Sequence, residues 1–94
     1  MIEFKNKIRV RCLECSEEHF IEMKLIGTEK QQRTISFEYE YIFRGELRCS
    51  CDEEMKLLTT IYEYPKGILN YIDHGDESCI TMDEITEDSI NIIW

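Results

Sequence analysis

Residues 35–44, with the sequence ISFEYEYIFR, show the clearest pattern in the chain and decide the expected fold. Apolar and aromatic side chains occupy every second position, and Glu38, Glu40 and Arg44 lie between them, with one apolar exception at Ile42. Successive side chains of a β-strand point to opposite faces, so this alternation predicts one long strand with a bulky inner face. The residues of that expected inner face are Ile35, Phe37, Tyr39, Tyr41 and Phe43.

Two further segments alternate in the same way and are predicted to be half-buried strands. Residues 7–12 place Ile8, Val10 and Cys12 on one face. Residues 55–64 place Met55, Leu57, Thr59 and Ile61 on one face. Less regular apolar stretches predict three short strands, at residues 19–26, 68–72 and 90–94.

Turn and loop signals separate these strands. Residues 28–33 are polar and aperiodic, which predicts a loop, and residues 64–67 (YPKG) predict a turn. Residues 73–76 (DHGD) are expected to close the strand before them. Residues 81–84 (TMDE) have the form of a capping box and predict a short helical turn.

The pattern leaves two segments open. Residues 19–26 also fit a helix that Ser16 caps and Gly27 ends. Residues 90–94 could be a docked tail, or an edge strand that pairs with its copy in a homodimer. Gly45 is expected to bend or bulge the aromatic strand.

We therefore expect a mostly β fold: a small antiparallel sheet of five to six strands with at most one short helix. The chain has no alanine and fourteen isoleucines, a composition that favours strands over helices. Its 94 residues predict a single domain over residues 1–94. If the first strand pairs with the aromatic strand, Arg9 and Arg11 would lie opposite two of its glutamates.

Four of the five cysteines form two close pairs, Cys12-x-x-Cys15 and Cys49-x-Cys51, with 33 residues between them. Each pair follows a predicted strand. Zinc prefers a tetrahedron of ligands such as thiolates, and two turns can each supply two of them. A bound ion would add folding free energy to a small core. The predicted cofactor is Zn²⁺, and its predicted ligands are Cys12, Cys15, Cys49 and Cys51.

Other uses of these cysteines stay open on the sequence alone. They could be buried free thiols, one or two disulfides, for example Cys12–Cys15, or a redox pair whose thiolate the nearby glutamates would disfavour. His19 could replace one cysteine as a ligand, whereas His74 is predicted to lie in a loop and Cys79 to pack as a small apolar residue. Arg11 and Arg48 each adjoin a ligand and are expected to offset thiolate charge.

The two cysteine pairs and the strands around them, roughly residues 7–64, resemble the zinc-ribbon group of folds, in which two cysteine-bearing knuckles on β-hairpins hold one zinc ion. The Cys-Ser-Cys pair departs from the usual pattern, because one residue rather than two separates its cysteines. The glycine that often follows a knuckle is also missing. The resemblance implies an architecture and brings no particular function with it.

Negative charge is concentrated in the second half of the chain. Residues 1–48 carry nine basic and nine acidic side chains, whereas residues 49–94 carry two basic and eleven acidic ones, which gives the net charge of -9. Such a field repels phosphate backbones and attracts basic surfaces, although a solvated acidic face would also simply keep the protein soluble. The predicted partner-binding residues are Asp73, Asp76, Glu77, Asp83, Glu84, Glu87 and Asp88.

The sequence thus predicts a zinc-stabilised protein-binding module that docks on a basic partner. An inhibitor, an immunity protein or a phage counter-defence protein would suit this size and charge. The alternative is a nucleic-acid-associated zinc ribbon, in which basic residues and the aromatic residues of a β-strand contact the nucleic acid. The residues for that alternative are Lys5, Lys7, Arg9, Arg11, Tyr39 and Tyr41.

Other classes of protein find little support in the sequence. The chain has no glycine-rich phosphate loop, no Gly-x-Ser-x-Gly and no His-Glu-x-x-His. Four thiolates would also close the metal's coordination shell, so we expect that the protein is not an enzyme. No apolar stretch reaches the length of a membrane span. Residues 1–5 lack the layout of a signal peptide, and a cytoplasmic protein is expected.

Overall fold

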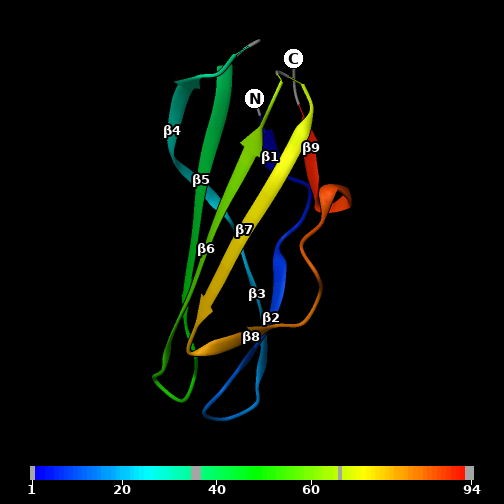
Figure 1. Ribbon diagram of the computed structural model, residues 1–94. Coiled ribbons are helices and arrows are strands. Elements are labelled where there is room, and N and C mark those ends of the chain that lie inside the picture. The colour runs from blue at the N-terminus through cyan, green and yellow to red at the C-terminus, as the bar shows by residue number, and fades with distance from the viewer. Residues whose placement is uncertain (1, 35–36, 66, 93–94) are drawn as a thin grey trace.

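The computed structural model describes residues 2–34, 37–65 and 67–92, and it shows a mostly β protein. The described residues form nine strands in three antiparallel sheets, more than the five to six strands expected (Figure 1). Within the described ranges the only helical element is a 3₁₀ turn, η1 (Glu87–Ser89), and no helix is long and apolar enough to cross a membrane. Sequence predictions that fall outside the described residues concern Ile35, Ser36, Lys66, Ile93 and Trp94.

A four-stranded meander forms the long axis of the molecule. β4 (Lys24–Gln32), β5 (Phe37–Arg48), β6 (Glu54–Glu63) and β7 (Leu69–Glu77) are neighbours in space in the order of the sequence. The pairing of β5 with β6 runs without a register shift, which confirms the two most regular predicted strands. The molecule is elongated along this sheet, with extents of 49 × 20 × 16 Å.

Two smaller sheets pack on one face of the meander (Figure 1). β1 (Ile2–Phe4) pairs with β9 (Ile90–Ile92), so the expected last strand pairs within the chain, and a homodimer stays a prediction. β2 (Ile8–Cys12) lies between β3 (Glu18–Ile21) and β8 (Cys79–Thr81). The first predicted strand therefore does not pair with the aromatic strand.

The apolar core lies between these two layers. The long sheet contributes Tyr41 and Phe43 from β5 and Met55, Leu57 and Ile61 from β6, and all five side chains are buried. The second layer contributes Ile2, Ile8, Val10, Cys12, Ile21, Cys79 and Ile90. The alternating faces predicted for β2 and β6 are thus confirmed.

The loop expected at residues 28–33 is a strand for most of its length. Residues 28–32 belong to β4 and pair with β5. Almost every side chain of β4 is exposed, so the segment carries no apolar alternation, and only the pairing with β5 holds it extended. The strand expected at residues 19–26 is divided between β3 and β4.

The aromatic strand is confirmed, but its inner face is shorter than predicted. Tyr41 and Phe43 are buried, whereas Tyr39 is half-buried and Phe37 is 38% exposed. Phe37 begins β5 at the end of the sheet, and the Lys30 ammonium lies 3.9 Å from the centre of its ring. The first aromatic ring of β5 is therefore covered by a cation rather than by the core.

Residues 73–76, expected to end a strand, lie inside β7 because they pair with β6. His74 is consequently a strand residue and not a loop residue. Its Nδ1 lies 2.6 Å from the Thr59 hydroxyl and its Nε2 lies 3.0 Å from the Thr81 hydroxyl. These two contacts link β7 to β6 and β8, and burial lowers the pKa of His74.

The helical turn lies later in the chain than predicted. Thr81 belongs to β8, where its N–H and its hydroxyl both donate to the Asp76 carboxylate, so it caps no helix. Thr86 caps η1 instead: its hydroxyl accepts the Asp88 N–H, and its own N–H donates to the Ser89 hydroxyl.

Gly45 pairs regularly opposite Leu57, without the expected bend or bulge. A Cβ atom at this position would lie 2.8 Å from Met23 Sδ and would also collide with Ile21. Glycine is therefore required here because the β3–β4 connection crosses close above β5, and not because the strand changes direction.

Candidate metal centre

Two tight turns at the lower end of the molecule in Figure 1 carry the four predicted ligands. Cys12 ends β2 and Cys15 follows in the β2–β3 turn, while Cys49 and Cys51 lie in the β5–β6 turn. The Ser16 N–H donates to the Cys12 carbonyl oxygen, which closes the first turn. The Asp52 N–H donates to the Cys49 carbonyl oxygen and closes the second.

Neither turn contains a glycine, and another residue takes over its conformation in each. Ser16 has φ 65° and Asp52 has φ 76°, both in the left-handed region that glycine usually occupies after a knuckle. Polar side chains such as serine and aspartate tolerate this region better than branched ones. The missing glycine therefore does not prevent a knuckle-like turn in either place.

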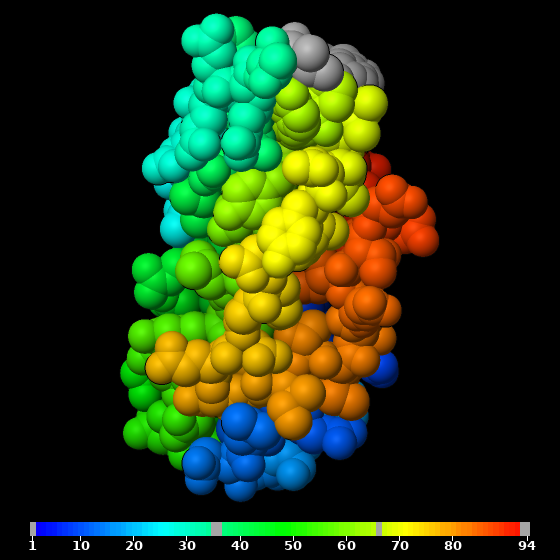
Figure 2. Space-filling model, viewed as in Figure 1, coloured from blue at the N-terminus to red at the C-terminus, as the bar shows by residue number. Residues whose placement is uncertain are grey.

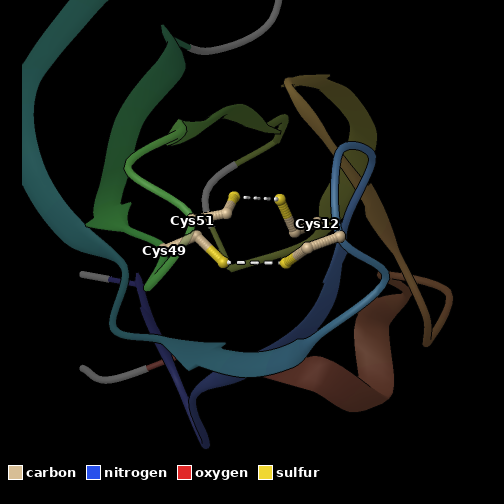
Figure 3. Close-up of side chains that lie close together, drawn as sticks. Cys12, Cys49 and Cys51 are labelled. Atoms are coloured by element: carbon tan, nitrogen blue, oxygen red, sulfur yellow. Dashed lines mark hydrogen bonds between the residues drawn. The ribbon is translucent and has the colours of Figure 1, made fainter.

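The four sulfur atoms point toward one another across the two turns (Figure 3). Cys12 Sγ lies 3.6 Å from Cys51 Sγ, and Cys15 Sγ lies 3.3 Å from Cys49 Sγ. All four lie within 4.8 Å of one another. A tetrahedral zinc ion with Zn–S bonds of about 2.3 Å places its sulfurs about 3.8 Å apart, so the cluster is nearly of the right size.

The cluster is half buried and fully reduced. Cys12 and Cys49 are buried, Cys15 and Cys51 are exposed, and all five cysteines, Cys79 included, are free thiols. Each turn thus supplies one buried and one exposed sulfur. The disulfide within the first pair is not formed, and the closest sulfurs belong to different turns.

The protonation of the thiols is uneven. The pKa of Cys49 is lowered to about 6, first by the Cys51 backbone N–H and, against the effect of burial, by the side chains of Cys15 and His19. The Glu53 N–H lowers the pKa of Cys51, but burial and the neighbouring thiols outweigh it and raise that pKa to about 12. One thiolate forms readily near neutral pH, and a bound divalent cation would supply the charge that deprotonates the others.

The two arginines expected to offset thiolate charge face carboxylates instead. Arg11 lies 4.0 Å from Glu18. Arg48 lies 3.3 Å from Asp52 and 3.5 Å from Glu54. Because both guanidinium groups already face carboxylates, a complex of one metal ion with four thiolates would keep most of its surplus negative charge.

The remaining candidate ligands lie in different places. His19 lies beside the cluster, with Nε2 3.3 Å from Cys49 Sγ, and does not replace a cysteine within it. Cys79 is buried and pairs opposite Cys12 between β8 and β2, as a small core residue should. His74 binds the hydroxyls of Thr59 on β6 and Thr81 on β8. Sequence reasoning did not single out Glu17 as a donor, although Glu17 and His19 lie two residues apart shortly after the first cysteine pair.

The acidic residues predicted to bind a partner are all exposed, on β7 and on the segment after β8. These segments run down the front and the right side of the view in Figure 2. Asp83 pairs with Arg9 at 3.2 Å, and Asp76 accepts hydrogen bonds from Thr81. The residues of this surface, which we call the acidic surface, are Asp73, Asp76, Glu77, Asp83, Glu84, Glu87 and Asp88.

The residues proposed for nucleic-acid binding do not form a stacking platform. Tyr41 is 6% exposed, and its ring stacks against that of Tyr39 with centroids 6.5 Å apart. Arg9 and Arg11 both lie near Glu18, at 3.9 and 4.0 Å. Tyr41 thus belongs to the core, Tyr39 packs against it, and both arginines lie within 4.0 Å of a carboxylate.

Comparisons of the chain with protein-family models, with curated proteins and with solved structures found no match. The fold and the site define a small β-rich protein in which two turns form a four-cysteine cluster of metal-binding dimensions. The likeness to zinc ribbons rests on that cluster.

Proposed function

We propose that the protein is a non-catalytic binding module, stapled by one structural zinc ion and docked through its acidic surface on a basic region of another protein. The observation that carries the docking role is the exposure of all seven carboxylates of that surface. Lys56 is the one basic residue described after position 48, and its ammonium lies 3.6 Å from Glu54. Among the described residues, Asp83 pairs with Arg9, and the other six carboxylates of the acidic surface form no ion pair.

Zinc fits the donor set better than other common ions do. Thiolates are soft ligands that select zinc, copper(I) or iron–sulfur clusters, whereas magnesium and calcium prefer oxygen. Four protein ligands leave no position for water or substrate, which is typical of structural zinc. The cluster joins the β2–β3 turn to the β5–β6 turn, so the ion would tie the two layers together at one end of the molecule.

The chemistry of the acidic surface favours a partner that binds phosphate backbones. A basic nucleic-acid groove carries the opposite charge, and electrostatic complementarity speeds association with such a groove. An inhibitor, an immunity protein or a phage counter-defence protein would act in this way, by covering the groove. The same field disfavours direct contact with nucleic acid.

The docking role is tested by reversing charge on the acidic surface. We expect a variant with Asp73→Lys, Glu77→Lys and Glu87→Lys to lose the partner captured from the native host. Its association rate with that partner should fall about 10-fold or more and become less dependent on salt. A matched control carries Glu3→Lys, Glu22→Lys and Glu29→Lys, which reverse three exposed charges in the first half.

Two results would contradict this role. The first is equal loss of association in both triple variants, which would reflect net charge and not the acidic surface. The second is retention of the wild-type protein on heparin at low salt with a steep salt dependence, the behaviour of a nucleic-acid binder.

A further inference from the structure

A second set of metal-binding side chains adjoins the four-cysteine cluster. The donor atoms of Glu17, His19 and Cys49 all lie within 4.8 Å of one another. Cys49 belongs to both sets, while Glu17 and His19 belong only to the second. A single ion inside the four thiolates would leave these two side chains unused.

The spacing of the second set suits a zinc ion. His19 Nε2 lies 3.3 Å from Cys49 Sγ and 3.5 Å from Glu17 Oε1. With zinc bonds of about 2.3 Å to sulfur and about 2.0–2.1 Å to nitrogen and oxygen, tetrahedral donors lie roughly 3.4–3.6 Å apart. One imidazole nitrogen, one carboxylate oxygen and one thiolate are all ligands that zinc accepts.

The carboxylate is also held in place by the opposite turn. The Ser50 hydroxyl donates to Glu17 Oε2, so the other oxygen, Oε1, is left on the side of His19. Hydrogen bonds of this kind orient metal ligands and are part of many metal sites. Ser50 lies between Cys49 and Cys51, so this bond links the two cysteine turns.

The charge of the first site favours a second cation. Four thiolates around one divalent ion carry a net charge of about -2, and Glu17 adds one more negative charge. Arg11 and Arg48 do not neutralise it, because each faces carboxylates. The exposed side chain of Glu17 gives an ion access from solvent and leaves room for water as a further ligand.

We propose that Glu17, His19 and Cys49 hold a second zinc ion, with the Cys49 thiolate bridging it to the ion in the four-cysteine site. This inference rests on the proposed structural zinc, since the bridge requires an ion on its other side. The second ion has three protein ligands and is therefore the weaker and more exchangeable of the two.

Zinc stoichiometry tests the second position. The full chain is equilibrated with micromolar free Zn²⁺ under reducing conditions, and bound zinc is measured by elemental analysis. We expect two zinc ions per wild-type chain, and one in each of His19→Gln and Glu17→Gln. Glu14→Gln removes an exposed carboxylate from the same turn and should keep two.

Each other outcome has a defined meaning. One ion in the wild type would overturn the second position and leave the structural zinc intact, whereas none would overturn both. Two ions in His19→Gln would also overturn the proposal, because the second ion would then lie elsewhere.

Cobalt tests the bridge itself. Two Co²⁺ ions that share a thiolate couple magnetically, so the electron paramagnetic resonance signal of the wild type should grow up to the first equivalent and decrease with the second. In His19→Gln it should not decrease. A signal that grows through both equivalents in the wild type would show two independent ions and would overturn the bridge.

Discussion

At the scale of single residues, two equally buried cysteines differ in their neighbours. Cys49 and Cys79 are both buried, but Cys49 Sγ contacts Cys15 Sγ and His19 Nε2, whereas Cys79 Sγ has only a long contact of 3.9 Å to the Lys56 carbonyl oxygen. Two buried cysteines of similar exposure therefore lie in different surroundings, one in the four-cysteine cluster and one in the core.

Serine substitution distinguishes these two cysteines. A structural zinc site supplies on the order of 10 kcal/mol in small domains, comparable with the whole stability of about 5–15 kcal/mol. We expect Cys49→Ser to lose bound zinc and to unfold at or near room temperature. Cys79→Ser should keep its zinc and lose about 1 kcal/mol. Thermal melts with metal analysis decide this, and equal Tm values for the two variants would count against the site.

Tyr41 makes stability depend on pH in the alkaline range. Burial, with the charge of Glu63 and the hydrogen bond from Tyr41 to it, raises the pKa of Tyr41 from 10.0 to about 12. Above pH 10 the unfolded chain ionises while the folded protein does not, so stability is lost as the pH rises from about 10 through about 12. Tyr41→Phe should flatten the curve of unfolding free energy against pH in this window. An unchanged slope would show that Tyr41 does not control it.

At the scale of elements, β5 should be energetically uneven along its length. Phe43 is 3% exposed and packs edge-on against Phe4, whereas Phe37 is 38% exposed. We expect Phe43→Ala to cost about 3–5 kcal/mol and Phe37→Ala to cost about 1 kcal/mol or less. Urea unfolding of both variants tests this. Similar losses would mean that the core extends to the start of β5.

The strands predicted correctly are those with one buried face. In β2 and β6 a core-facing residue follows every solvent-facing one, so the alternation is visible in the sequence. β4 and the second half of β7 lie at the edges of the long sheet, and most of their side chains are exposed. Backbone pairing and polar contacts such as those of His74, rather than an apolar face, hold those segments, and they leave no periodic trace in side-chain polarity.

The candidate site was more predictable than the fold around it. Close pairs of cysteines are typical of metal sites, so the clustering of Cys12, Cys15, Cys49 and Cys51 could be predicted from their spacing. Glu17 could not, because a carboxylate in an acidic chain has many neighbours of its kind. Which strands pair was also not predictable, because the approach of β3 to β5 depends on the missing side chain of Gly45.

At the scale of the whole molecule, the four-cysteine cluster and the acidic surface adjoin at one end, where the Ser78 carbonyl oxygen, next to Glu77, accepts the Leu13 N–H of the first cysteine turn. The cysteine turns occupy one end of an elongated body, and the acidic surface runs along β7 and the segment after β8. We infer that the metal stiffens the scaffold while the acidic surface meets the partner. Under this division, reversing charges on the acidic surface changes association and leaves zinc content unchanged.

The central claim is that the four cysteines hold a structural zinc ion. Elemental analysis of the full chain, purified under reducing conditions without added metal, tests it most directly. The account predicts at least one zinc ion per chain, whose removal by a strong chelator abolishes cooperative unfolding. Folded, reduced protein with a metal content near zero would contradict the account.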